Sequence, residues 1–216
     1  LHKAIRRQRQ MCIRDRNDDT YKMDTTLMMS HNAFNILVAL TTLDVIGVLN
    51  VKKFESALNQ LVIPGRAEVY RVNGRLIIVD SHLPAMLDCL KELKEQGKVN
   101  KIKVVVGSMG HGYKHWEERF KTQEFASQRK DVRKYAMSLL IGIADYVYLT
   151  ESDSGKENPI DICNELEADL DGKVQSLIIL DREEAIKQAV LDSEEGDVVF
   201  ILSLIHISEP TRLALI

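Results

Sequence analysis

A cation, a carboxylate and an imidazole stand close together in the segment IPGRAEVYRVNGRLIIVDSHLP, residues 63–84. Arg66 follows a Pro-Gly pair, and its planar guanidinium is suited to holding a phosphate with two hydrogen bonds. Asp80 and His82 follow an apolar run, and a carboxylate at a strand end can bind a ribose hydroxyl. The segment therefore predicts a nucleotide site, in which we expect Arg66 and Asp80 to be catalytic and His82 to help bind the nucleotide.

Two asparagines near the start of a helical pattern, Asn32 and Asn35, are candidate contacts to the base of that nucleotide. Their spacing puts them on one helix face, and side-chain amides can donate to and accept from an adenine edge. Each signal also has a simpler interpretation. Ser30 or Asn32 can be a helix N-cap, Asp80 or Ser81 can cap the helix that follows them, and Arg66 can be a solvated residue of a linker turn.

Two polar loops that follow predicted strands are candidate substrate contacts. The first, GSMGHG at residues 107–112, is rich enough in glycine for its backbone to approach a ligand closely. His111 and Lys114 could neutralise a carboxylate or a phosphate there, although the loop matches neither a Walker loop nor a dinucleotide fingerprint. The second, TESDSGKENP at residues 150–159, carries Asp153 and Glu157, which could bind a substrate ammonium group. Polar loops are common by default.

Other kinds of chemistry have no support in the sequence. The histidines show no zinc-ligand spacing, so we expect no metal site of that kind. There is no Gly-x-Ser-x-Gly nucleophile elbow, and the three cysteines form no even framework, which favours reduced thiols in the cytosol. No apolar run approaches the ~18 residues of a membrane span, so we expect no membrane association.

The elements that must position these residues follow from the hydrophobic pattern. Helices are predicted over residues 27–47 and 51–61, and a hairpin over 67–80 that turns on Asn73-Gly74, a pair typical of a type I′ turn. Beyond it the pattern alternates, with helices at 84–96, 115–143, 159–170 and 182–192 and strands at 101–106, 145–150, 174–180 and 197–202. The alternation predicts an α/β fold with a Rossmann-like, mostly parallel sheet that binds ligands at its strand carboxyl ends.

The two ends of the chain differ from the rest. Residues 1–16 hold six Arg or Lys and one Asp without a helical or strand period, and residues 203–216 follow an apolar strand without a turn signal. Both contain strings, MCIRDR and SLIHISEPTR, that resemble translated sequencing-adapter read-through, so we expect both to be non-native; the alternative for residues 1–16 is a basic nucleic-acid arm. Without the +5 of the first segment and the neutral last segment, the net charge of −3 becomes −8. An acidic body argues against general nucleic-acid binding.

Singly these signals are weak, but their order is specific. The motifs that carry it are Asn32-Ala33-Phe34-Asn35, Pro64-Gly65-Arg66, Val79-Asp80-Ser81-His82-Leu83-Pro84, Val106-Gly107, Ala144-Asp145-Tyr146-Val147, Glu157-Asn158-Pro159, Asp181-Arg182 with Ala185-Ile186, and Gly196-Asp197. This order resembles the Mur ligase family, in particular the C-terminal portion of the members that add the third residue of the peptidoglycan stem peptide. The resemblance covers about residues 27–202.

The resemblance implies that residues 17–62 end a central ATPase domain and that residues 63–202 form an amino-acid-binding C-terminal domain. The parent would be an ATP-dependent ligase that adds an amino acid to a UDP-N-acetylmuramoyl-dipeptide through an acyl phosphate, with ATP and Mg²⁺. By position, Asn32 and Asn35 would lie near adenine, Arg66 near the phosphates, and Asp80 near the ribose. The resemblance further implies a monomeric cytoplasmic enzyme whose partners are the UDP-muramoyl peptide and the amino acid.

Departures from the family pattern qualify these expectations. The P-loop and carbamylated lysine, with most Mg²⁺ ligands, belong to an upstream part that this chain lacks, and the segment expected after the last strand is replaced from Ser203. We therefore expect this polypeptide to be inactive alone. The diaminopimelate-type Asp-Asn-Pro-Arg motif aligns with Ser152 to Gly155 without its arginine. That favours an amino acid with a neutral or cationic side chain, such as lysine or ornithine, over diaminopimelate. Asp153 and Glu157 could bind a side-chain amine.

Three alternatives remain open at this point. The basic stretch at residues 117–135, with Arg119, Lys121, Arg129, Lys130, Arg133 and Lys134, is expected to be a solvated helix face, or else a lid. The parent could be a divergent folylpolyglutamate- or cyanophycin-type ligase. The chain could also be a non-catalytic Rossmann-like binding domain, since arginines are absent around Gly112 and Gly155.

Overall fold

The computed structural model describes residues 9–14, 20–25, 31–61, 67–81, 83–110 and 124–202. The chain divides into two compact units, Leu1–Ile63, here the N-terminal unit, and Pro64–Ile216, here the sheet unit. This division lies one residue beyond the boundary expected from the sequence. No helix in the described part of the chain is long and apolar enough to cross a membrane.

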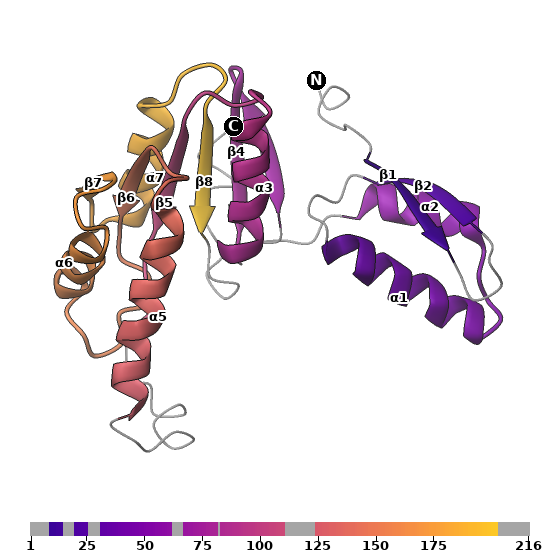
Figure 1. Ribbon diagram of the computed structural model, residues 1–216, viewed down its shortest axis with the longest axis horizontal. Helices are drawn as coiled ribbons and strands as arrows, with labels where there is room; N and C mark the ends of the chain where they lie inside the picture. Colours follow the sequence, from indigo (N-terminus) through magenta and orange to yellow (C-terminus); the bar gives the residue numbers. More distant parts are fainter. Residues whose placement is uncertain are drawn as a thin grey trace. The chain divides into compact units, whose positions relative to one another are not determined.

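Among its described residues, the N-terminal unit contains two strands and two helices (Figure 1). Helix α1 spans His31–Val45 and helix α2 spans Val51–Gln60, and Ile36, Leu40 and Leu58 are buried between them. The side chain of Asn50 caps α2 by accepting a hydrogen bond from the Lys53 backbone N–H at 3.0 Å. Asn32 lies inside the first turn of α1, so it is not the N-cap of this helix.

Strands β1, Arg9–Arg14, and β2, Thr20–Thr25, pair antiparallel, with Met11 opposite Met23. Residues 1–16 show no strand period in their sequence, yet residues 9–14 form a strand. The ladder is made by backbone groups of two separate segments. The side-chain pattern of one strand alone does not reveal such a partner.

The sheet unit is built on one six-stranded sheet in the order β3-β4-β8-β5-β6-β7. Its strands are β3 Glu68–Val72, β4 Arg75–Asp80, β5 Ile102–Val106, β6 Tyr146–Leu149, β7 Gln175–Ile178 and β8 Val198–Leu202. Only β3 runs antiparallel, and the other neighbours pair in parallel. The predicted α/β fold with a mostly parallel sheet and an initial hairpin is confirmed.

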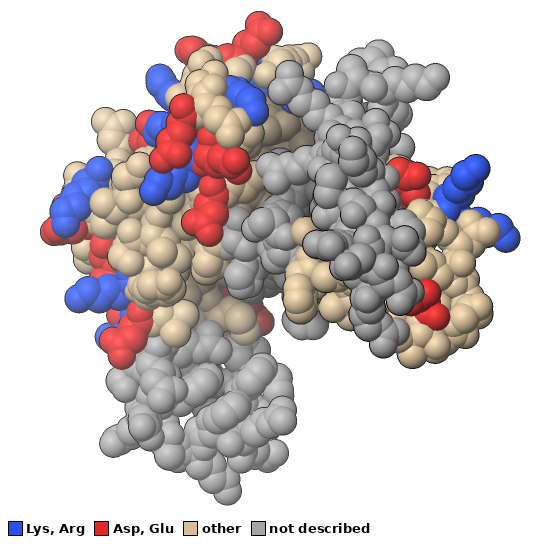
Figure 2. All heavy atoms as spheres, turned by 45° about the vertical axis from the view of Figure 1, so that its right-hand side comes forward, with Lys and Arg blue, Asp and Glu red and all other residues tan. Residues whose placement is uncertain are grey.

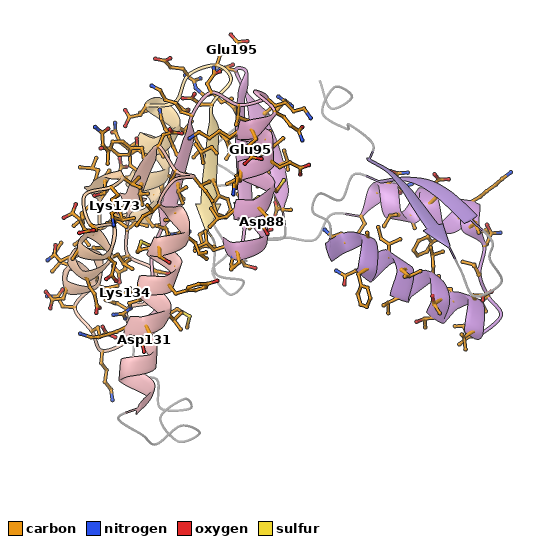
Figure 3. The ribbon with its side chains drawn as sticks, in the orientation of Figure 1. Asp88, Glu95, Asp131, Lys134, Lys173 and Glu195 are labelled. Atoms are coloured by element: carbon orange, nitrogen blue, oxygen red, sulfur yellow. The ribbon has the colours of Figure 1, made fainter. Side chains whose placement is uncertain are left out.

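The turn of the β3–β4 hairpin has the predicted chemistry. Asn73 and Gly74 both have positive φ, 48° and 78°, as a type I′ turn requires. A Cβ at Gly74 would lie 2.5 Å from Cγ of Glu195, so this position also requires glycine for space. Glu195 marks the end of the sheet that carries this turn (Figure 3).

Helices cover both faces of the sheet. They are α3 Leu83–Glu95, α5 Glu124–Leu140, α6 Pro159–Asp169 and α7 Arg182–Leu191. Helix α7 packs its buried residues Ala185, Ile186 and Ala189 on one face, whereas α3 and α5 lie in front of the sheet in Figure 1. The chain moves along the sheet in one direction through β5, β6 and β7 and then returns to β8, and right-handed crossovers require α7 to lie on the opposite face.

The surface charge of the chain is mixed. On the face seen in Figure 2, Lys and Arg are interspersed with Asp and Glu, without a continuous basic area among the residues that are drawn in colour. The residues drawn in colour on that face therefore offer no extended positive surface for a phosphate backbone.

Candidate functional site

The carboxyl ends of the parallel strands meet at one edge of the sheet, which faces down in Figure 1. In the register of the sheet Asp80, at the end of β4, pairs with Leu202, at the end of β8. The backbone N–H of Thr150 donates to the carbonyl of Val106 at 3.0 Å, which joins the ends of β6 and β5. The loops after β4, β5 and β6 therefore surround one edge, where ligands bind in open α/β sheets.

Asp80 is 2% exposed, and its Oδ2 accepts a hydrogen bond from the backbone N–H of Ala67 at 2.9 Å. Ala67 has φ of 48°, a conformation that non-glycine residues rarely adopt. This contact fixes the backbone immediately after Arg66. It differs from both roles that the sequence suggested for Asp80, a ribose contact and a helix cap. Arg66 and His82 themselves lie outside the described residues.

The 107–110 loop packs against the 150–158 loop. A Cβ on Gly107 would lie 2.5 Å from the Thr150 carbonyl oxygen, and one on Gly110 would lie 1.6 Å from that of Ser154. The N–H of Gly110 donates to the Asp153 carbonyl at 2.6 Å. These two glycines therefore allow close loop-to-loop packing, and the approach of this loop to a ligand stays a prediction.

Arg133 of α5 has an environment that the sequence interpretation missed. Its side chain is 2% exposed, so the expected solvated face of the basic stretch is wrong at this position. Nη1 and Nη2 bind the two carboxylate oxygens of Glu157 at 3.0 and 2.9 Å. Nη1 also reaches Glu165 at 2.7 Å, and Nη2 donates to the Met109 carbonyl at 2.9 Å.

The charges around Arg133 compensate each other. Burial alone would lower the pKa of Arg133, but its hydrogen bonds to Glu157 and Glu165 and the charges of both carboxylates raise that pKa above its ordinary value. Lys130 adds a second cation 3.3 Å from Glu165. The guanidinium therefore stays charged and holds two carboxylates in a partly buried network.

The predicted substrate contacts have different surroundings. Glu157 has both carboxylate oxygens bonded to Arg133. The side chain of Asp153 is exposed, while its backbone carbonyl is held by Gly110. Its neighbour Glu151 is also exposed and accepts a hydrogen bond from the Ser154 hydroxyl at 3.1 Å. His111 and Lys114 lie outside the described residues.

Asn32 and Asn35 belong to the N-terminal unit. They share a face of α1 as predicted, because Nδ2 of Asn35 donates to Oδ1 of Asn32 at 3.2 Å. Asn35 is exposed and Asn32 is half-buried. Their contact to adenine stays a prediction, and so does the nucleotide role of Asp80.

In the described part of the chain, no group of three or more His, Cys, Asp or Glu residues could hold a metal ion. Mg²⁺ prefers several carboxylate and water oxygens in octahedral geometry. The described residues do not fit such a site.

The arrangement at this edge coincides with a match to a known protein family. Residues 65–203 match the family model described as Mur ligase, glutamate ligase domain. The chain belongs to the Mur ligase family. The matched residues include the whole six-stranded sheet, Asp80, the 107–110 and 150–158 loops, and Arg133.

Curated relatives are moderately similar in sequence. The UDP-N-acetylmuramyl-tripeptide synthetase of Lactobacillus delbrueckii subsp. bulgaricus is 33% identical over 148 residues, covering 67% of this chain and 26% of the relative. A ligase of Geobacillus kaustophilus named for 2,6-diaminopimelate is 29% identical over 189 residues, 85% of this chain and 35% of the relative. One of Streptococcus thermophilus named for L-lysine is 29% identical over 146 residues, 67% of this chain and 27% of the relative. The chain thus spans about a quarter to a third of the length of these relatives.

Solved structures share the fold. A folylpolyglutamate synthase of Thermotoga maritima superposes with a TM-score of 0.58 at 22% identity, over 86% of this chain and 39% of that protein. At this identity the likeness shows a common architecture alone.

Proposed function

We propose that this chain is the C-terminal part of an ATP-dependent ligase that joins an amino acid to a UDP-N-acetylmuramoyl-dipeptide in the cytoplasm. The observation that carries the proposal is the family match over the sheet unit, together with a relative named as a tripeptide synthetase. In such a ligase the sheet unit presents the incoming amino acid at the carboxyl edge of its sheet. Residues 17–62 supply the end of the ATPase domain.

The residues of this chain act by binding and by orientation. ATP, when bound, supplies the phosphoryl group that activates the acceptor carboxylate. Asp80 fixes the backbone next to Arg66, so that the guanidinium can face a phosphate group. Asn32 and Asn35 offer amides to the base. The packed 107–110 and 150–158 loops hold the amine of the amino acid in one place and help to exclude water, which would hydrolyse an acyl phosphate.

The amino acid proposed for this site carries a cationic side chain, as lysine and ornithine do. Asp153 and Glu151 are exposed acids on the 150–158 loop, whereas the carboxylate of Glu157 is bonded to Arg133. Asp153 is therefore better placed than Glu157 to bind a side-chain amine. Position 155 is glycine and offers no guanidinium for the second carboxylate of diaminopimelate.

The test of the proposal is an assay of the full-length protein that contains this chain. UDP-N-acetylmuramoyl-L-alanyl-D-glutamate, ATP and Mg²⁺ would be offered with lysine, ornithine or diaminopimelate, and the product mass and phosphate release measured. We expect an added lysine or ornithine residue. Ligation of glutamate to a folate, without any product from the muramoyl peptide, would overturn the proposal, and faster ligation of diaminopimelate than of lysine would overturn its amino-acid part.

The 216-residue chain by itself should release no phosphate from ATP in the same assay, because the phosphate-binding loop belongs to the upstream part of such a ligase. Release of phosphate that depends on both the muramoyl peptide and the amino acid would contradict this expectation.

A further inference from the structure

Arg133 connects four parts of the sheet unit through one buried guanidinium. It extends from α5 and reaches the 107–110 loop at Met109, the 150–158 loop at Glu157, and α6 at Glu165. We propose that Arg133 is a positioning residue for the amino-acid substrate, holding the 150–158 loop against the 107–110 loop in the shape that binds the amino acid. This inference rests on the proposed function.

The geometry of the contact requires arginine. Two separate nitrogens of Arg133 bind the two oxygens of Glu157 at 3.0 and 2.9 Å, a side-by-side pairing that fixes the plane of the carboxylate. The same two nitrogens reach Glu165 and the Met109 carbonyl. A lysine ammonium has the charge but not the planar fork, so it cannot make all of these contacts together.

Near its start the 150–158 loop is also held by the Thr150 hydroxyl and the Glu151 N–H, which both donate to the Leu180 carbonyl at 3.1 Å. Thr150 is its only buried residue, and most of the others, including Asp153, are exposed. Its remaining contacts to the neighbouring loop include the 2.6 Å hydrogen bond from the Gly110 N–H to the Asp153 carbonyl. Because so few apolar side chains anchor the loop, loss of Arg133 should change the loop while the sheet stays folded.

Loss of Arg133 would also change the charge balance of the cluster. Arg133 and Lys130 face Glu157 and Glu165, so the cluster is neutral. Without the guanidinium, Glu157 and Glu165 would repel each other. Glu157 would then lose its fixed position against Arg133, and the 150–158 loop would lose the contact that orients it.

The core on the opposite face is separate from this cluster. It is formed by strand residues such as Val105 and Val199 together with Ala185 and Ile186 of α7. None of these residues contributes to the Arg133 network. A change at Arg133 can therefore be tested for a local effect against a global one.

The experiment compares variants of the full-length protein by steady-state kinetics. Arg133→Met should raise the KM for the amino acid by at least about tenfold, while the KM values for ATP and the muramoyl peptide stay within about twofold. Arg133→Lys keeps the charge, and with it the fold, and should give an intermediate rise. Lys134→Met is the matched control, since Lys134 is an exposed neighbour on the same helix (Figure 3).

Hydrogen exchange of the same variants gives a readout that does not depend on turnover. In Arg133→Met and Arg133→Lys the amides of residues 151–157 and of Gly110 should exchange faster than in wild type, with the strand amides unchanged. Lys134→Met should match wild type.

The outcomes separate the positioning role of Arg133 from the proposed function of the protein. An unchanged amino-acid KM in both Arg133 variants would overturn the positioning role, as would a proportional change of all three KM values with faster exchange throughout the sheet unit. A wild-type protein that ligates no amino acid would overturn the proposed function. In that case the hydrogen-exchange result still tests the role of Arg133. Faster amide exchange confined to the two loops in the Arg133 variants supports their positioning by Arg133, and unchanged amide exchange overturns it.

Discussion

The carboxylate of Asp80 accepts a hydrogen bond from the backbone N–H of Ala67, so the end of β4 is tied to the residue that follows Arg66. Thirteen positions separate the two residues in the chain, and the antiparallel pairing of β3 with β4 brings them together. Asp80 is almost fully buried, which makes the loss of this contact costly. The residue is therefore both a candidate site residue and a structural one.

Replacement of Asp80 by alanine should lower the free energy of unfolding by about 1–3 kcal/mol, because the partly buried N–H of Ala67 loses its acceptor. Asp80→Asn retains an oxygen acceptor and should cost less. Urea unfolding monitored by circular dichroism measures both. The matched control is Asp88→Ala, an exposed aspartate on α3 (Figure 3), which should be near neutral. Equal stability of the Asp80→Ala and Asp88→Ala variants would refute the structural role.

Gly107 and Gly110 should not tolerate a methyl group. The added Cβ would lie 2.5 Å from the Thr150 carbonyl oxygen or 1.6 Å from that of Ser154, closer than atoms can approach. We expect Gly107→Ala and Gly110→Ala to destabilise the chain by about 1–3 kcal/mol, more for Gly110. Thermal melts measure the effect, and Ser108→Ala in the same loop is the control. A Gly110→Ala variant as stable as that control would show that the loops do not pack in this way.

Local signals allowed most of the fold to be predicted. The Asn73-Gly74 turn depends on backbone conformations that these two residue types favour, and the helices show their own 3.6-residue period. The insertion of β8 between β4 and β5 could not be predicted in this way, because strand order depends on which distant segments pair. The pairing of β1 with β2 was missed for the same reason.

The candidate site was harder to predict than the fold. Asp153 and Glu157 were found as acids on one loop, but the position of Glu157 against Arg133 depends on how α5 packs. One signal could have revealed Arg133. It precedes the buried residues Met137 and Leu140 by four and seven positions, so it lies on the apolar face of its helix. An arginine on such a face needs a carboxylate partner.

Cys163 should be inert to alkylation in the folded chain. Burial, and the nearby charges of Glu151 and Glu167, raise the pKa of its thiol to about 11, against about 8.5 for an exposed cysteine. Iodoacetamide at pH 8 should leave Cys163 unmodified in the native protein and modify it readily in urea, as peptide mass spectrometry would show. Rapid alkylation of the native protein at this position would contradict the burial of the thiol.

The same shift predicts an alkaline loss of stability. Because the folded state raises the pKa of Cys163, its contribution to stability is present below about pH 8.5 and is lost as the pH rises through about 11. Burial and a hydrogen bond to Asp192 raise the pKa of Tyr148 as well, so its effect has the same sign. Urea unfolding at pH 8 and pH 10 should therefore give a lower free energy at pH 10. Cys163→Ala should lessen the difference, and an equal difference in that variant would refute the role of the thiol.

Asp153 should control the affinity for a cationic amino acid. In the full-length protein, Asp153→Asn removes one exposed negative charge and should raise the KM for lysine by about tenfold, with the KM for ATP unchanged. Asp153→Lys should weaken lysine binding further, because the new charge repels the substrate. Asp171→Asn is the matched control, an exposed aspartate that pairs with Lys173 in the turn between α6 and β7. If both Asp153 variants keep the wild-type KM for lysine, the amine is bound elsewhere and the charge argument for lysine fails.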